Sequence, residues 1–253
     1  MPTLNPTHIV FIENVLRTAQ LVGITNIVAA PEGVAGIDDD KKVLMLEMNN
    51  VPEFPFGSIG INRIDVFLSR LSLAKSCDNF AAEFETATDQ KTESQFARQI
   101  IFKGNGVKVE YRCAAPKIVL AAINDKAQFP KSLNDPRRYS VNLTPEAALL
   151  LSKAQTAMSA DVVTLVSDDD GVHFKLSDIN SDEFVHTFAK EPKLVGEKTP
   201  TTEFSHMYPV KLLMPLFKQN SQATMFIGQK GTLSMSVNNL NVIVFPTRKE
   251  SNV

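Results

Sequence analysis

The side chains that could do chemistry are few and are scattered along the chain. The four histidines show no HExxH or other paired metal-ligand spacing, and they are His8, His173, His186 and His206. The glycine-containing turns at 104–106 and 228–231 match no phosphate-binding loop, and no nucleophile elbow is present. The sequence therefore predicts a protein without a catalytic site, a cofactor or a bound metal.

Two runs of three aspartates, at 38–40 and 168–170, are the other candidates for chemistry. Carboxylate clusters can bind divalent cations. Each run also lies in a predicted hairpin turn, where aspartate is favoured because it hydrogen-bonds the nearby backbone. We expect turns here rather than metal sites.

Composition limits the classes of function. The 253 residues are 43% hydrophobic and carry a formal net charge of -2, so the chain is not a generally basic nucleic-acid binder. Cys77 and Cys113 cannot form a disulfide framework or a cysteine-based zinc site, which fits a reducing cytoplasm. No apolar run has the length of a membrane span, and the N-terminus lacks the features of a signal peptide.

Four segments carry helical patterns. Residues 5–22 form the first, with Thr7 as N-cap and Gly23 as its end, and residues 61–75 form the second. The third starts at Pro145, with Thr144 as N-cap and Glu146 in the first turn. The fourth, 209–220, begins at Pro209 and should be kinked or shortened by Pro215.

The four predicted helices are basic in an otherwise acidic chain. They hold three acids, Glu13, Asp65 and Glu146, and seven basic residues, which are Arg17, Arg63, Arg70, Lys75, Lys153, Lys211 and Lys218. Their net charge is therefore +4, which leaves -6 for the rest of the chain. Lysine and arginine are good helix formers that solvate helix faces. Alternatively, the helices line one surface that faces phosphate.

The remaining ordered segments read as short strands. In the first half they are 24–30, 43–49, 79–86, 98–104, 106–112 and 117–123, and in the second half 139–143, 162–166, 172–176, 183–191, 203–208, 223–229, 232–238 and 240–246. A linker with two prolines, 124–138, interrupts the strand pattern at mid-chain. We therefore expect a domain at 1–123, a connector at 124–138 and a second domain at 139–253.

The two halves repeat one plan. In each, a helix precedes strands, and a glycine-containing turn leads into two closing strands, at 103–122 and 228–246. Hairpin turns favour antiparallel sheets with helices on one side. The expected fold class is α+β, with two similar domains that each pack two helices on antiparallel sheet.

This arrangement resembles a family, the DNA polymerase sliding clamps, and most of all the trimeric clamps of large tailed phages, which are relatives of the PCNA family. The matching stretches are 61–75, 128–133, 139–166 and 168–178. The chain departs from the family in the PEFPFGSIG segment at 52–60, in the proline of the fourth helix and in a longer loop at 192–202.

The resemblance implies a DNA-clamp fold and a processivity factor rather than an enzyme. Three copies would form a homotrimeric ring around duplex DNA, with the seven basic helix residues facing the DNA. A clamp loader would load the ring, and the ring would tether the replicative DNA polymerase. Some relatives also act in transcription, so phage transcription factors are a further class of partner. If a phage encodes the protein, it would act in the cytoplasm of the host. Strand 117–123 of one copy would pair with 183–191 of the next.

The resemblance also implies a pocket for partner peptides near the connector. The candidate residues are Phe129, Pro130, Leu133, Val244, Phe245 and Pro246. Val244 and Phe245 also fit an ordinary strand, as core and edge residues. The alternative function is a structural β-rich virion protein, which would assemble without tethering a polymerase to DNA.

Overall fold

The computed structural model describes residues 2–40, 42–47, 51–127, 135–190, 193–194, 203–220 and 222–247. The chain divides into two compact units, Met1–Gln128 with Asn238–Leu240, and Phe129–Val237 with Asn241–Val253. Every strand pairing of known register is antiparallel, and helices pack on the sheets, so the α+β prediction is confirmed. None of the described helices is long and apolar enough to span a membrane.

Helix α1 (Pro6–Leu21) opens the first unit. The side chain of Asn5 accepts a hydrogen bond from the backbone N–H of His8 at 2.9 Å, so Asn5 is the N-cap and the predicted cap, Thr7, lies inside the helix. Asparagine caps at least as well as threonine and leaves Pro6 at the favourable first position. The helix ends before Gly23, whose φ of 74° suits a glycine.

Four strands follow α1: β1 (Ile24–Ala30), β2 (Gly33–Asp38), β3 (Val43–Glu47) and β4 (Ile59–Ile61). Within the first unit their order is β3-β2-β1-β4. The turn between β2 and β3 contains the first aspartate run. There the carboxylate of Asp38 accepts the backbone N–H groups of Lys42 and Val43, both at 2.7 Å, and thereby closes the turn.

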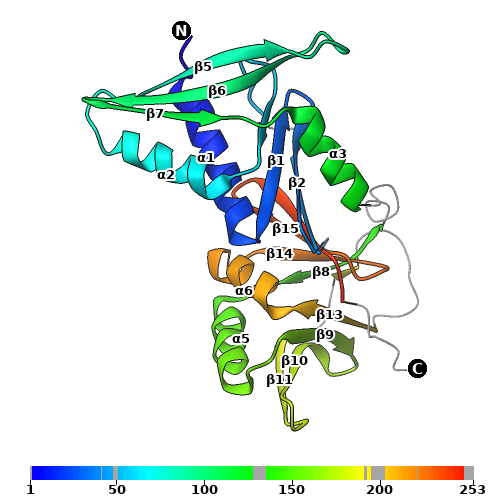
Figure 1. The fold of residues 1–253 in the computed structure, drawn as a ribbon. Coiled ribbons are helices and arrows are strands. Elements are labelled where there is room, and N and C mark those ends of the chain that lie inside the picture. Colours follow the sequence, from blue (N-terminus) through cyan, green and yellow to red (C-terminus); the bar gives the residue numbers. More distant parts are fainter. Residues whose placement is uncertain are drawn as a thin grey trace. The chain divides into compact units, whose positions relative to one another are not determined.

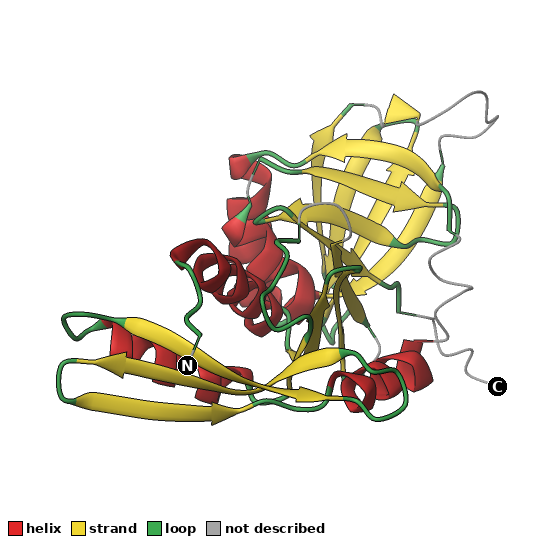
Figure 2. Cartoon of the chain, turned by 90° about the horizontal axis from the view of Figure 1, so that it is seen from above, coloured by secondary structure: helices red, strands yellow, loops and turns green. Residues whose placement is uncertain are grey.

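Helix α2 (Ile64–Lys75) begins three residues later than predicted, because Arg63 has a non-helical φ of -139°. The helix buries Ile64, Phe67, Leu68, Leu71 and Ala74. It packs on the sheet of β5 (Ala81–Thr88), β6 (Gln95–Gly104) and β7 (Val107–Arg112), whose order is β5-β6-β7. Phe67 packs edge-on against Phe102 and Tyr111. Figure 1 shows α1 and α2 beneath this sheet, and Figure 2 shows its three long strands side by side.

The predicted strand 117–123 is wrong, because this segment belongs to helix α3 (Pro116–Ala127). A short apolar run does not distinguish strand from helix by itself. Here Pro116 starts the helix, Val119 and Ile123 are buried one turn apart, and Ile118 is 65% exposed. Helix α3 packs on β1, β2 and β4, so the described part of the first unit has three helices rather than the expected two.

The second unit begins with β8 (Arg137–Asn142) and α5 (Pro145–Met158), which Thr144 caps through the backbone N–H of Ala147 as predicted. The next strands are β9 (Val162–Asp168), β10 (Gly171–Ser177), β11 (Glu183–Ala189), β12 (Lys193–Leu194) and β13 (Phe204–Pro209). Helix α6 (Val210–Gln219) and strands β14 (Thr224–Gly228), β15 (Leu233–Val237) and β16 (Leu240–Val244) complete the unit.

The two units share one sheet plan. The second unit has a four-stranded sheet in the order β11-β10-β9-β13, which matches β3-β2-β1-β4 strand for strand. Helices α5 and α6 pack together and cover this sheet, α5 on β10 and β11 and α6 on β13. The strands β12, β8, β14, β15 and β16 follow one another in a second sheet. The doubled order read from the sequence corresponds to this repeated sheet, but the first half ends in helix α3 where a second closing strand was expected.

Pro215 does not shorten the fourth helix. Helix α6 continues through it to Gln219, and Pro209 is the last residue of β13 rather than the first of the helix. One missing N–H costs one ladder bond. Six residues of this ten-residue helix are buried, among them Leu213 and Phe217, so tertiary packing holds the helix together.

The expected connector, 124–138, coincides only in part with irregular backbone. Its first four residues belong to α3, and its last two belong to β8. Asp135 lies between these elements, and its carboxylate accepts the backbone N–H groups of Lys230 and Thr232 at 2.9 and 3.1 Å. This buried carboxylate fixes the start of the second unit to the turn after β14.

Candidate nucleic-acid interface

A carboxylate holds two of the predicted DNA-facing residues of the first unit. Glu13 on α1 accepts hydrogen bonds from Arg17, at 2.7 Å one turn further along α1, and from Lys75 at the end of α2. Burial raises the pKa of the Glu13 carboxyl, but the hydrogen bonds from Lys75 and Arg17 outweigh it, so the pKa lies below its usual range. Glu13 therefore stays ionised at neutral pH and neutralises part of this basic surface.

Arg63 and Arg70 lie on the other side of α2, against strand β7. The guanidinium of Arg63 donates to the backbone carbonyl of Arg112 at 3.3 Å and lies 5.4 Å from the ring centre of Tyr111. The guanidinium of Arg70 donates to the backbone carbonyl of Glu110. Arg63 and Arg70 thus both donate hydrogen bonds to backbone carbonyls of strand β7.

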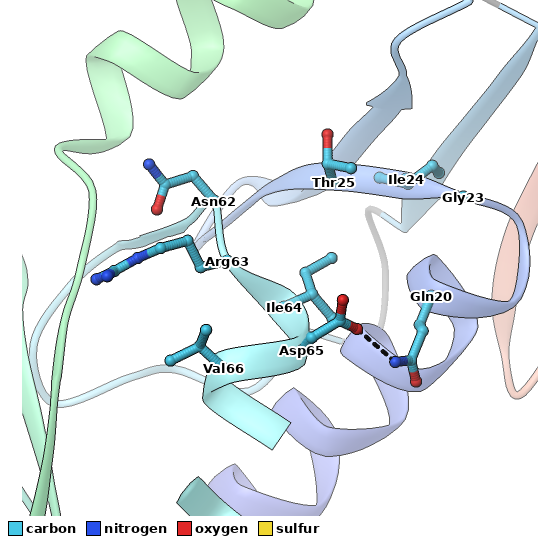
Figure 3. Close-up of a pocket in the computed structure, with 9 residues that line it drawn as sticks. All are labelled: Gln20, Gly23, Ile24, Thr25, Asn62, Arg63, Ile64, Asp65 and Val66. Carbon is cyan, nitrogen blue, oxygen red and sulfur yellow. Dashed lines mark hydrogen bonds between the residues drawn. The ribbon is translucent and has the colours of Figure 1, made fainter. Parts of the chain in front are cut away.

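A pocket of about 310 Å³ lies between the end of α1 and the start of α2. Gln20, Gly23, Ile24 and Thr25 line it from the end of α1 and the start of β1. Residues Asn62–Val66 line it from the start of α2. Figure 3 shows the hydrogen bond from Gln20 to Asp65, 2.5 Å long, that joins the two helices, while Arg63 is directed away from both residues. This exposed bond is one of the contacts between the two basic helices.

The second unit presents the other three predicted residues on its helices. Lys153, Lys211 and Lys218 are all exposed. On α5 the buried stripe contains Ala147, Ala148, Leu151 and Ala154, so Lys153 lies on the solvent side of the helix. Among the ion pairs between described residues, none involves Lys153 or Lys218. Lys153 and Lys218 can therefore contact phosphate without first breaking any ion pair seen among the described residues.

Only some of the residues predicted to form the pocket for partner peptides belong to the part of the chain that the structure describes. Phe129, Pro130 and Leu133 lie outside the described residues. Val244 is fully buried in β16 and belongs to the core, whereas Phe245 and Pro246 are half-buried.

Pro246 lines a pocket of about 380 Å³ whose other members sequence reasoning did not find. They come from β9, from β13 and from the segment after β16, and they are Thr164, Ser205, His206, Met207 and Thr247. The backbone N–H of Thr247 donates to the carbonyl of Met207 at 2.7 Å, which ties the C-terminal segment to β13. Burial lowers the pKa of His206, so this histidine is neutral at pH 7. No spacing in the sequence joins these positions.

The second aspartate run forms a turn, as the first one does. Asp168 accepts the backbone N–H of Asp170 at 3.1 Å and bonds Nε2 of His173 at 2.6 Å. The other ring nitrogen of His173 lies 3.0 Å from the hydroxyl of Thr187 on β11, so the buried histidine is fully hydrogen-bonded. Within the described residues, no group of histidine, cysteine and acidic side chains is arranged to hold a metal ion.

No protein-family model matches the sequence, and no curated protein sequence matches it significantly. Solved structures do match. Proliferating cell nuclear antigen (PCNA) from Entamoeba histolytica is 14% identical, with 94% of this chain and 95% of that chain covered and a TM-score of 0.58. PCNA from A. fulgidus, solved with the C-terminal region of FEN-1, is 16% identical, with 95% and 96% covered and a TM-score of 0.58.

The DNA polymerase sliding clamp from Bacillus subtilis also matches, at 14% identity and a TM-score of 0.58. The match covers 94% of this chain and 62% of that one. These likenesses extend over almost the whole chain and therefore include both units. The chain has the fold of the DNA sliding clamps.

Proposed function

We propose that this protein is a sliding clamp, a non-catalytic ring that encircles duplex DNA and tethers a DNA polymerase. One observation carries the proposal: the clamp fold extends over 94–95% of the chain in the matches to the two PCNA structures. The basic residues on its helices support it. A ring is held on DNA by its topology, so weak, salt-sensitive phosphate contacts suffice and still permit sliding.

Three copies form the ring in this proposal, joined through strand edges. In the first unit β7 is the end strand of the sheet β5-β6-β7, and in the second unit β11 is the end strand of β11-β10-β9-β13. Strand β7 of one copy pairs with β11 of the next and continues the sheet. It takes the place of residues 117–123, which are helical. Exposed apolar side chains beside β11 support this surface: Leu149 and Leu150 on α5 and Val185 on β11.

The edges are complementary in length and charge. The backbone N–H of Cys113 donates to the backbone carbonyl of Arg98 on β6 at 2.9 Å. Backbone N–H and C=O groups alternate in direction along a strand. The backbone groups of Lys108, Glu110 and Arg112 therefore point away from β6. The bond from the N–H of Asp178 to the carbonyl of Asp182 places Glu183, Val185 and Thr187 outward on β11 by the same argument. Three outward residues therefore face three. Lys108 and Arg112 outweigh Glu110 on β7, which leaves one net positive charge opposite Glu183 on β11.

We further propose that the basic helix residues, Arg17, Arg63, Arg70, Lys75, Lys153, Lys211 and Lys218, face the duplex. A clamp loader opens and closes the ring, and partner proteins insert peptides at the pocket lined by Pro246. Phage transcription factors are a further class of partner for this pocket. If a phage encodes the chain, the ring acts in the cytoplasm of the host.

Processivity on primed circular DNA tests the function. With its own polymerase and clamp loader, the protein should lengthen the products made in one binding event, and leaving out the loader should abolish the gain. Mass photometry of the protein alone should show three copies per particle. A structural virion protein would assemble without either effect on synthesis. Monomers at all concentrations, with no gain in product length, would contradict the proposal.

A further inference from the structure

The carbonyl groups that Arg63 and Arg70 bond are the outward groups of the β7 edge. Arg112 and Glu110 belong to the alternate set of β7 residues that point away from β6. A strand that pairs with β7 must donate its own N–H groups to these same carbonyls. The two arginines therefore occupy acceptors that a ring contact requires.

The other edge carries no such cover. Among the described residues, none donates a hydrogen bond to the outward carbonyls of Glu183, Val185 or Thr187 on β11. Helix α6, which holds the place of α2 in the second unit, contains no arginine. Of the two strand edges in the proposed contact, only β7 therefore has outward carbonyls bonded by side chains of the described residues.

We propose that Arg63 and Arg70 guard the β7 edge, holding its outward carbonyls until β11 of a second copy displaces them. Guanidinium groups suit this role, because their planar forks bond carbonyls strongly while the long side chains can swing into solvent. An unguarded strand edge invites pairing with any exposed strand. The guard weakens nonspecific pairing and lowers the affinity of the ring contact, and it rests on the ring proposed above.

The test compares the self-association of matched variants of the full chain, without DNA, by sedimentation equilibrium. Arg63→Met with Arg70→Met removes both sets of donors and keeps two unbranched side chains of similar length. Arg17→Met with Lys75→Met is the control, because it removes the same charge from α1 and α2 at residues bonded to Glu13 instead of β7. Loss of two hydrogen bonds from charged donors corresponds to a tightening on the order of tenfold or more.

The outcomes separate the guard from the ring. Tighter association of the Arg63/Arg70 variant than of both wild type and control supports the guard, as does association of that variant alone. If the wild type associates and the Arg63/Arg70 variant associates equally tightly or more weakly, the guard proposal is wrong, while the proposed ring is still supported. If no form associates up to its solubility limit, both are wrong.

Should the double methionine variant melt early or fail to fold, Arg63→Lys with Arg70→Lys replaces it. Lysine keeps the charge and the packing stem but loses the fork geometry. The guard predicts a tightening of a few-fold for this variant at unchanged thermal stability. An unchanged dissociation constant would mean that the arginines only fasten α2 to β7.

Discussion

Replacing Glu13 with glutamine should strengthen DNA binding while slightly weakening the fold. Glu13 neutralises Arg17 and Lys75, which bond it from α1 and from α2. The Arg17 side chain is 57% exposed and the Lys75 side chain 36% exposed, so solvent screens both pairs. A helical pair at this spacing contributes about 0.3–0.5 kcal/mol and an exposed tertiary pair about 0.2–1 kcal/mol. The expected loss of stability is therefore about 1 kcal/mol.

That loss corresponds to a fall in Tm of about 2–4 °C for a chain of this size. The pKa of Glu13 is lowered by folding, so its stabilisation is present above the pKa of the unfolded chain and is lost as pH falls through the lower, folded value. The difference in Tm between wild type and variant should accordingly be full at pH 7 and shrink as the pH falls below about 4. Thermal denaturation across this pH range measures it.

The effect on DNA should run in the opposite direction. Freeing Arg17 and Lys75 adds one unit of positive charge per copy and three per ring. Each additional phosphate contact steepens the dependence of log K on log salt by about 0.9. Fluorescence anisotropy with a short duplex, measured over a salt series, should therefore give tighter binding and a slope steeper by up to about 3 for Glu13→Gln.

The matched control is Glu83→Gln. Glu83 pairs with Lys103 at 2.6 Å across the β5–β6 pair, on the face of β5 opposite the buried Ala82 and Phe84, and its loss changes the net charge by the same amount. Tighter binding by the Glu13 variant alone supports a DNA-facing surface on α1 and α2. Equal tightening of DNA binding by the two variants would mean that net charge alone, and not a specific surface, explains the result. No effect of either would refute the assignment of Arg17 and Lys75 to the DNA-facing wall.

Three further predictions concern the second unit. Lys153→Gln with Lys218→Gln should leave Tm unchanged, because both side chains are exposed, and should lower the salt slope of DNA binding by up to about 0.9 per lost contact; an unchanged slope would exclude these lysines from the interface. Phe217→Ala removes a fully buried ring that packs against Phe174, and chemical denaturation should show a loss of about 3–5 kcal/mol. Gly171→Ala should cost about 1–3 kcal/mol in the same assay, because φ is 125° and a Cβ would lie 2.5 Å from a carbonyl of β11; a loss within error would contradict this strain.

Local signals explain what the sequence could predict. The cap at Thr144, the end of α1 before Gly23 and the turns at the two aspartate runs depend on neighbouring residues, and they lie where they were expected. The run 117–123 failed because its apolar residues fit a strand as well as a helix, and its packing on β1, β2 and β4 decided the outcome. Of the two outcomes expected at Pro215, a kink or a shortened helix, shortening did not occur, because burial of α6 outweighs one missing backbone bond.

The partners of the basic residues could not be predicted, because they are distant in sequence. Lys75 meets Glu13 across 62 positions, and Arg70 meets the carbonyl of Glu110 across 40. Counting charges on helices treated all seven basic residues as equivalent. The structure separates three classes: cations held by a carboxylate, cations held on a strand edge, and exposed lysines.

Retention on DNA of different topology tests the central claim most directly. After loading onto a nicked circular plasmid by the clamp loader, the protein should remain bound through a wash at high salt, because a closed ring needs no strong contact. Cutting the plasmid at one site should release it within the sliding time. Retention that is equal on circular and linear DNA, and that is lost at high salt on both, would show ordinary surface binding and contradict the ring.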